Sequence, residues 1–347
     1  MNFELPAYRA PVWLPGGHGQ TIWPALYARR FVGPRPRWRR ERWDTPDGDF
    51  IDVDWLHADA PPAAGGAGAI RAAPPLLVLF HGLEGSSRSH YAEAFAGWAR
   101  AHGLALAVPH FRGCSGEINR APRAYHSGDH AEIGWLLRRF RAAQAARGGG
   151  PLLAVGISLG GNALLRWAGE WGQAARPVVD AIAAVCAPLD LAAGGHAIGR
   201  GFNRQVYNRV FLRTMKAKAR AKLAQHPGLF DAAALRAARD LYAFDDLFTA
   251  PLHGFAGVLD YWRRASAKPL LPAIRVPALA LNARNDPFVP AASLPCRDEV
   301  GRWVTLWQPD EGGHVGFAQG ALPGHVMWLP QAVGGWLLAP HSELPTH

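Results

Sequence analysis

The stretch Pro151–Trp167, PLLAVGISLGGNALLRW, decides the fold. Its first part, Leu152–Val155, is a short apolar run of the kind found in buried strands, and its last part opens an apolar-periodic helix. Between the two lies Gly156-Ile157-Ser158-Leu159-Gly160, with a glycine two residues before and two residues after the serine. A G-x-S-x-G between a strand and a helix predicts a strained turn that exposes the Ser158 hydroxyl at the carboxyl edge of a sheet. The glycines avoid the collisions that side chains would make there, and the helix N-terminus favours developing negative charge.

Strand-like and helix-like segments alternate on both sides of this stretch. Five further apolar runs have the length and composition of buried strands: Pro75–Phe80, Leu104–Pro109, Ala181–Cys186, Ala278–Leu281 and Trp303–Trp307. Helices are predicted between or after them at Tyr91–Ala101, Asp129–Ala146 and Pro330–Leu338. This alternation predicts an α/β fold with a mostly parallel central sheet flanked by helices.

The segments outside this alternation belong, in our interpretation, to the same single domain of residues 1–347. Residues 1–35 are rich in Pro and Gly and predict an irregular N-terminal arm. Within it, the aromatic and apolar piece Gly17–Leu26 is expected to pack on the rest of the chain, where it either covers the domain surface or lines the mouth of an active site. Residues 58–73 have the small, low-complexity composition of a surface loop. Residues 190–270 contain no buried-strand run and predict a mostly helical insertion that caps the sheet edge, with helices at Phe230–Tyr242 and Leu252–Ala267.

A β-hairpin is predicted before the first buried strand. Trp38–Trp43 and Phe50–Leu56 flank Thr45–Asp49, which has the composition of a tight turn. In the second run Asp52 and Asp54 alternate with apolar residues. We therefore expect an edge strand pair that presents these two carboxylates on an exposed face.

Composition and charge narrow the function classes. The formal net charge is +10, from 37 Lys+Arg and 27 Asp+Glu, but basic residues are spread along the chain and are dense only at Arg29–Arg42 and Arg200–Lys222. We therefore expect no nucleic-acid partner, and a basic patch at Arg200–Lys222 that binds nucleic acid or a membrane surface is the weaker alternative.

Three cysteines without C-x-x-C spacing predict neither a disulfide framework nor structural zinc, and they favour a reducing compartment. The sequence shows no signal peptide and no apolar stretch of about 18 residues, so we expect a cytoplasmic protein without a transmembrane anchor.

A serine nucleophile needs a base to take its proton, and that base is usually histidine. In a parallel sheet the partners must come from loops at the carboxyl ends of the strands. Of the 15 histidines, His314 lies in the glycine-rich loop that leaves the last predicted strand, and we predict that it is the base. His325, near the closing helix, is the rival, whereas His341 and His347 lie in the C-terminal tail.

The base must in turn be oriented by a carboxylate. Asp286 follows the penultimate strand in Asn285–Pro290, where two prolines constrain the loop, and we predict that it is the acid. Asp190, which follows the strand ending at Cys186, is the main alternative. Asp310, close to the predicted base in sequence, is the third candidate.

Negative charge on a carbonyl oxygen needs two backbone N–H donors. One donor is expected from Leu159, directly after the nucleophile, and the other from the loop after Pro75–Phe80. The second loop reads His81-Gly82-Leu83, and we assign its donor to Leu83.

Other chemistry is weakly supported. His126 and His130 are spaced i, i+4 beside Asp129, but no third metal ligand is evident, so we predict no metal and place His126–Asp129 at a helix N-terminus near the active-site edge. Cys114 stands in a glycine-rich loop without a His or Cys pattern that would make it a nucleophile. Neither a G-x-x-x-x-G-K-[ST] motif nor a strand-coupled G-x-G-x-x-G motif is present, so no nucleotide cofactor is expected.

Over roughly residues 10–340 the chain resembles the YheT-like branch of the α/β-hydrolases, which is related to eukaryotic abhydrolase-domain lipases and esterases. The resemblance rests on short motifs along the chain: His18-Gly19-Gln20-Thr21, Asp44–Trp55, His81-Gly82-Leu83-Glu84-Gly85-Ser86-Ser87, Phe111-Arg112-Gly113-Cys114-Ser115-Gly116, Tyr125-His126-Ser127-Gly128 and Gly156-Ile157-Ser158-Leu159-Gly160-Gly161-Asn162. It implies an α/β-hydrolase fold in which Ser158, Asp286 and His314 occupy the catalytic positions. The eukaryotic relatives carry an N-terminal membrane anchor, for which this sequence shows no candidate segment.

The residues and the resemblance together predict a serine hydrolase that cleaves carboxylic esters through a Ser–Asp–His triad and an acyl-enzyme, without a cofactor. The substrate is expected to be a small-molecule ester of carboxylesterase or acylglycerol-lipase type, with lipid-like esters included. A thioesterase or acyltransferase on the same fold and a non-catalytic binding protein are the alternatives. The acyl-chain length, the alcohol group and the oligomeric state are left open by the sequence.

Overall fold

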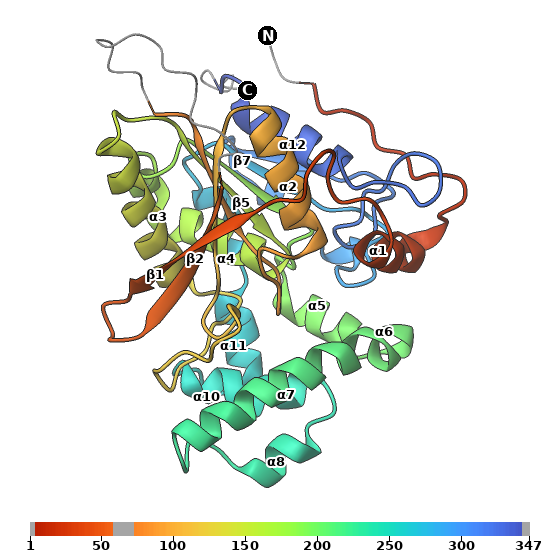
Figure 1. Cartoon of the computed structure of the whole chain (residues 1–347). Coiled ribbons are helices and arrows are strands. Elements are labelled where there is room, and N and C mark those ends of the chain that lie inside the picture. The colour runs from red at the N-terminus through yellow and green to blue at the C-terminus, as the bar shows by residue number, and fades with distance from the viewer. Residues whose placement is uncertain (1–3, 58–72, 342–347) are drawn as a thin grey trace.

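A computed structural model describes residues 4–57 and 73–341, and its centre is an eight-stranded sheet in the order β1-β2-β4-β3-β5-β6-β7-β8 (Figure 1). The strands are β1 Trp38–Asp44, β2 Phe50–Leu56, β3 Leu76–Phe80, β4 Ala105–Pro109, β5 Leu152–Ile157, β6 Ala181–Val185, β7 Ala278–Leu281 and β8 Val304–Trp307. β1 and β2 form an antiparallel hairpin at one edge, β2 pairs antiparallel with β4, and all pairings from β4 to β8 are parallel. The prediction of a mostly parallel sheet is confirmed. The loop predicted at 58–73 lies, except for its last residue, outside the described residues.

Helices cover both faces of this sheet. In β3, Leu76, Val78 and Phe80 belong to the core on one face, and Leu77 and Leu79 belong to the core on the other. The first core is shared with α3 (His130–Ala145) and α4 (Leu159–Trp171), and the second with α2 (His90–Ala101) and α12 (Trp328–Leu338). This continuous apolar character is what a strand buried on both faces requires.

The described chain between β6 and β7 contains helices but no strand of the sheet. These helices are α5 Leu191–Ile198, α6 Gly201–Gln205, α7 Tyr207–Gln225, α8 Ala232–Ala237, α9 Leu241–Phe244, α10 Ala250–Leu252 and α11 Val258–Ala265. Figure 1 shows them gathered at the lower end of the molecule, below the sheet. The single helices predicted at 230–242 and 252–267 are wrong in detail, because each is interrupted. In the second, Gly254 and Gly257 take positive φ values of 72° and 156°, which end the helical path.

The expected exposed face of the hairpin is also wrong. Asp52 and Asp54 are only 2% and 3% exposed, because arginines directly opposite on β1 cover them. Arg42 Nε lies 2.8 Å from Asp52 Oδ1, and Arg40 Nε lies 2.7 Å from Asp54 Oδ1. The alternation along β2 correctly placed Asp52 and Asp54 on one face of the strand. Whether that face is exposed depended on the residues opposite them on β1, and these are arginines that cover it.

The N-terminal arm contains a helix that the sequence did not predict. α1 (Gly16–Leu26) includes Pro24, which has no N–H to donate within the helix. Its residues Gln20 and Thr21 are nevertheless buried, so contacts with the rest of the chain stabilise it. Prolines and glycines therefore misled the prediction of an irregular arm.

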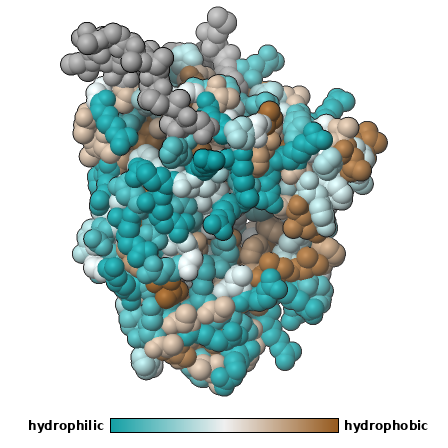
Figure 2. All heavy atoms as spheres, in the orientation of Figure 1, coloured by the Kyte–Doolittle hydropathy of each residue, from teal (hydrophilic) through white to brown (hydrophobic). Residues whose placement is uncertain are grey.

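The face of the molecule seen in Figure 2 is mostly hydrophilic, with hydrophobic side chains gathered at its right side near a hollow. Within residues 4–57 and 73–341, none of the helices combines the length and apolar composition that crossing a bilayer requires.

Candidate active site

Ser158 stands in a strained turn between β5 and α4. Its φ of 53° and ψ of −117° lie outside the favoured regions for a residue with a side chain. A Cβ on Gly156 would lie 2.4 Å from the Gly160 oxygen, and a Cβ on Gly160 would lie 2.6 Å from the carbonyl oxygens of Phe80 and His81. Both contacts are with backbone, so the two glycines are needed for the turn to pack against α4 and the end of β3.

His314 lies within hydrogen-bond distance of both predicted partners. Its Nε2 is 3.0 Å from Ser158 Oγ, and its Nδ1 is 2.8 Å from Asp286 Oδ2. Because an ionised carboxylate only accepts hydrogen bonds, Nδ1 carries the proton and Nε2 presents its lone pair to the serine hydroxyl. The structure thus brings together three residues from loops after β5, β7 and β8.

Asp286 is held in place by its own loop. Its Oδ1 accepts the backbone N–H groups of Phe288 and Val289 at 2.7 and 3.3 Å, which leaves Oδ2 for His314. The side chain of Asp286 is fully buried, and the Phe288 ring packs 4.3 Å from the imidazole. The carboxylate therefore has one orientation, with each oxygen assigned to a different donor.

The two residues predicted to supply backbone donors line the same cavity as Ser158. Leu83 and Leu159 both line it together with the serine and the histidine. The turn that contains Leu83 continues into Glu84, whose φ is 57°. Glu84 N–H donates to the hydroxyl of Tyr125 at 3.0 Å, and this hydroxyl donates to Glu84 Oε1 at 2.7 Å. Lys218 of α7 also donates to Glu84 Oε1, at 2.8 Å, so the helical segment after β6 is tied directly to this turn.

The alternative acids and base lie apart from the serine. Asp190 caps α5, because its Oδ1 accepts the Ala193 N–H at 3.0 Å. The side chain of Asp310 is 95% exposed, and His325 pairs through its backbone with Arg29 and Gln319. None of these candidates contacts His314 or Ser158 in the hydrogen bonds found within the described residues.

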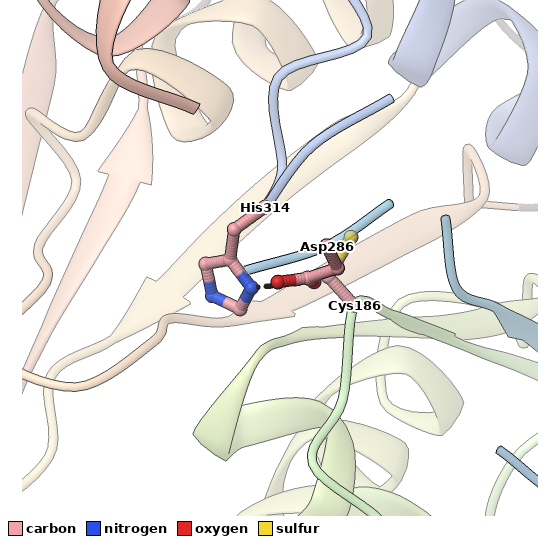
Figure 3. A group of neighbouring side chains, drawn as sticks. All are labelled: Cys186, Asp286 and His314. Atoms are coloured by element: carbon pink, nitrogen blue, oxygen red, sulfur yellow. Dashed lines mark hydrogen bonds and ion pairs between the residues drawn. The ribbon is translucent and has the colours of Figure 1, made fainter. Parts of the chain in front are cut away.

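Cys186 completes a cluster with Asp286 and His314, shown in Figure 3. Its thiol accepts the Val315 N–H at 3.2 Å and lies 3.6 Å from the Gly313 oxygen, and its backbone φ is 50°. Burial raises the pKa of this thiol well above its ordinary value, so the thiolate that would bind a metal is disfavoured. We interpret the cluster as support for the histidine loop.

The histidine pair considered for metal binding has another environment. His126 Nδ1 accepts the Gly128 N–H, and its ring packs 4.5 Å from that of His253. Among the described residues, His126, Asp129 and His130 do not form a group whose ligand atoms lie close enough together to hold a metal ion. Cys114 accepts a hydrogen bond from Lys218, and burial raises its pKa to about 11.

A mostly apolar cavity of about 130 Å³ opens above Ser158. One wall comes from the sheet edge and the other from the helices between β6 and β7. Its apolar lining includes the following residues: Leu83, Ile118, Ala124, Tyr125, Leu159, Pro188, Leu191, Ile198, Phe211, Met215, Leu241, Phe244, Phe248, Tyr261, Trp262 and Phe288. His126 and Ser127 line it as well, which agrees with their predicted place near the site. Such a lining favours a ligand with an extended apolar part.

Asp245 is a buried acid in the wall of this cavity. Burial raises its pKa from 3.8 to about 6, although Thr249 Oγ1 and Trp262 Nε1 both donate to the carboxylate, at 2.6 and 2.9 Å. The folded chain therefore binds this proton more tightly than the unfolded chain does. The resulting contribution to stability is full below the unfolded pKa of 3.8 and is lost as the pH rises through about 6.

The variant Asp245→Asn is expected to lose this pH dependence. Between about pH 4 and about pH 7, the free energy of unfolding of the wild type should fall by about 2–3 kcal/mol relative to that of the variant. Asn can still accept the Trp262 N–H and can donate to the Thr249 hydroxyl, so the packing is kept. Urea denaturation of both proteins at the two pH values measures the effect. A difference in unfolding free energy that is equal at both pH values would contradict the prediction.

Several residues near the site were missed from sequence. Cys186 gave no signal, because a lone cysteine at a strand end is common in cores. Asn285 was named in the predicted acid loop as the neighbour of Asp286, but its hydrogen bonds to Gln20 and Gly313 were not foreseen. Gln20 and Thr21 were noticed as part of the apolar piece Gly17–Leu26 and of a motif of the family resemblance, but neither was given a role at the site.

Comparisons with known proteins agree with the fold described above. The profile of the family described as alpha/beta hydrolase fold matches residues 75–321. YheT of Escherichia coli (strain K12), which is provisionally named an esterase, is 41% identical over 322 residues that cover 92% of this chain and 89% of that protein. Human phospholipase ABHD3 is 26% identical over 319 residues, covering 91% of this chain and 75% of the relative. A solved esterase structure from Pyrococcus furiosus matches with a TM-score of 0.50 at 14% identity, covering 89% of this chain and 99% of the other.

Proposed function

This chain belongs to the α/β-hydrolase fold family, and we propose that it is a serine hydrolase that cleaves carboxylic esters through an acyl-enzyme. The observation that carries the proposal is the pair of hydrogen bonds that joins Ser158 Oγ to His314 Nε2 at 3.0 Å and His314 Nδ1 to Asp286 Oδ2 at 2.8 Å. This is the geometry that an activated serine requires.

In the first half of the reaction, His314 Nε2 takes the proton of Ser158 while Oγ attacks the ester carbonyl carbon. The carbonyl oxygen becomes an oxyanion, which the N–H groups of Leu83 and Leu159 stabilise by hydrogen bonds. The positively charged imidazole is stabilised by Asp286. When the tetrahedral intermediate collapses, the carbon–oxygen bond to the alcohol breaks, and His314 donates its proton to the departing oxygen.

In the second half, a water molecule replaces the alcohol. His314 takes one proton from this water, whose oxygen attacks the acyl carbon and forms a second tetrahedral intermediate in the same donor pair. Collapse breaks the bond to Ser158 Oγ, which recovers its proton from His314. The products are a carboxylic acid and an alcohol, and the enzyme returns to its starting protonation state.

The cavity supports an ester with an apolar acyl or alkyl part. Aromatic and aliphatic side chains form most of its wall, and the relatives are named an esterase and a phospholipase. We propose that residues 190–270 act as a cap, since the helices of this segment contribute Phe211, Met215 and Phe248 to the cavity. Residues 1–35 would then be an N-terminal arm of the same domain.

Labelling with a fluorophosphonate tests the proposal, because this electrophile reacts with an activated serine far faster than with an ordinary serine hydroxyl. The wild-type protein is expected to take up one label per chain, at Ser158 by peptide mapping, and Ser158→Ala is expected to take up none. Hydrolysis of p-nitrophenyl esters of increasing acyl length then gives kcat/KM for the acyl site. A folded wild-type protein that remains unlabelled and hydrolyses none of these esters would overturn the proposal.

A further inference from the structure

Helix α1 lies between the loop of the proposed acid and the loop of the proposed base, and Gln20 joins the two. Gln20 is fully buried. Its Oε1 accepts the Gly312 N–H at 2.8 Å and the side-chain amide of Asn285 at 2.9 Å. Its Nε2 donates to the Leu14 oxygen at 3.0 Å. One side chain of the N-terminal arm therefore links two loops that lie more than 260 residues away in sequence.

Thr21 completes this attachment one residue later. Its Oγ1 accepts the backbone N–H of His314 at 2.9 Å and donates to the Gly17 oxygen at 2.7 Å. The N–H of Gly313, between the two residues held by the arm, donates to Asn285 Oδ1 at 2.9 Å. Three consecutive backbone N–H groups of the histidine loop are thus held by side chains outside that loop.

The backbones of α1 and the two loops approach too closely for side chains. A Cβ on Gly316 would lie 1.8 Å from the backbone oxygen of Gln20, and a Cβ on Gly313 would lie 2.7 Å from the backbone carbonyl carbon of Gln20. A Cβ on Gly17 would lie 1.9 Å from the Asn285 oxygen. The histidine loop therefore packs against α1 with no room for a side chain at these glycines.

We propose that Gln20 and Thr21 are positioning residues that set the His314 ring in line with Ser158 and Asp286. The inference rests on the proposed function. Both residues act through the backbone of the histidine loop, since neither lines the cavity above the serine. Misplacement of a reacting group by about 1 Å can cost about 100-fold in rate, so a contact that fixes the loop acts on kcat.

The alternative is that α1 only covers the surface of the domain. In that case changes at Thr21 would alter stability, and activity would follow the folded fraction alone. The positioning role differs because it depends on one acceptor atom, Thr21 Oγ1, and on its bond to the His314 N–H. A substitution that keeps the volume and removes this acceptor separates the two cases.

The test compares Thr21→Val, which removes the hydroxyl at nearly constant volume, with Thr21→Ser, which keeps it. Thr214→Val is the matched control, because the Thr214 hydroxyl also donates to a backbone oxygen in a helix, at 3.0 Å, but touches neither loop. For the folded Thr21→Val protein we expect a fall in kcat of about 10- to 100-fold on a p-nitrophenyl ester, with KM changed less than about twofold. The rate of fluorophosphonate labelling should fall in step, and Thr21→Ser and Thr214→Val should remain close to wild type.

Gln20→Met provides the second variant if Thr21→Val fails to fold, because Met fills a similar volume without an acceptor. Its kcat is expected to fall in the same range. Wild-type kcat in folded Thr21→Val or Gln20→Met would overturn the positioning role, as would an equal loss in Thr21→Ser. These outcomes presuppose an active wild type, so they are distinct from failure of the proposed function, in which the wild type itself is neither labelled nor active.

Discussion

Replacing Ser158 by alanine is expected to lower kcat for hydrolysis of a short-chain p-nitrophenyl ester about 10⁶-fold. Without Oγ there is no hydroxyl for His314 to deprotonate, and no acyl-enzyme can form. The residual rate would come from the proposed oxyanion donors, the Leu83 and Leu159 N–H groups, which would still polarise the carbonyl of a bound ester. Initial rates over a range of substrate concentrations measure the loss, with thermal unfolding as a check on folding.

Ser293→Ala is a suitable control for this variant. The Ser293 hydroxyl donates to the Pro290 oxygen at 2.7 Å in a short 3₁₀ segment and does not line the cavity. Its removal is expected to leave kcat unchanged. Retention of more than about a tenth of wild-type kcat in Ser158→Ala would contradict a serine mechanism.

Asp286→Asn is expected to lower kcat about 10⁴-fold while the protein stays folded. The N–H groups of Phe288 and Val289 hold the oxygen at the Oδ1 position, so the new amide NH₂ must face His314 Nδ1. This favours the tautomer with the proton on Nε2, which then has no lone pair for the Ser158 proton. Stopped-time assays at high enzyme concentration can measure a loss of this size.

Asp190→Asn is the matched control, because Asp190 was the main alternative acid. Its carboxylate caps α5 by accepting the Ala193 N–H, and asparagine caps helices about as well as aspartate. We expect wild-type kcat for this variant. The reverse result, a large loss of kcat in Asp190→Asn and little change in Asp286→Asn, would show that Asp190, which follows β6, orients His314 in place of Asp286.

The serine turn was predictable from sequence because its determinants are local. A strand, a serine between two glycines and a helix occupy one continuous stretch, and the collisions that exclude side chains at Gly156 and Gly160 are with backbone close to that turn or at the end of β3. His314 and Asp286 lie far from Ser158 in sequence, yet they too could be predicted. Their prediction required only that the sheet be parallel, because the loops that leave the carboxyl ends of neighbouring strands meet at one edge.

The hairpin and α1 were predicted less well because their environment depends on distant partners. Asp52 and Asp54 alternate with apolar residues, as exposed residues do, yet arginines on the paired strand cover them. In α1, proline and glycine argue against a helix, and contacts of Gln20 with loops far along the chain outweigh that local tendency.

The sequence by itself determined a mostly parallel α/β sheet and the strained turn of Ser158, because strand periodicity and turn chemistry act over a few neighbouring residues. Strand-end positions and the family resemblance predicted Asp286 and His314 as the partners of this serine. Only the tertiary structure decided how the histidine loop is held. Its N–H groups are satisfied by Gln20, Thr21 and Asn285, which lie far away along the chain. A hydrogen bond between such distant residues leaves no periodic trace in the sequence, since it depends on how whole elements pack.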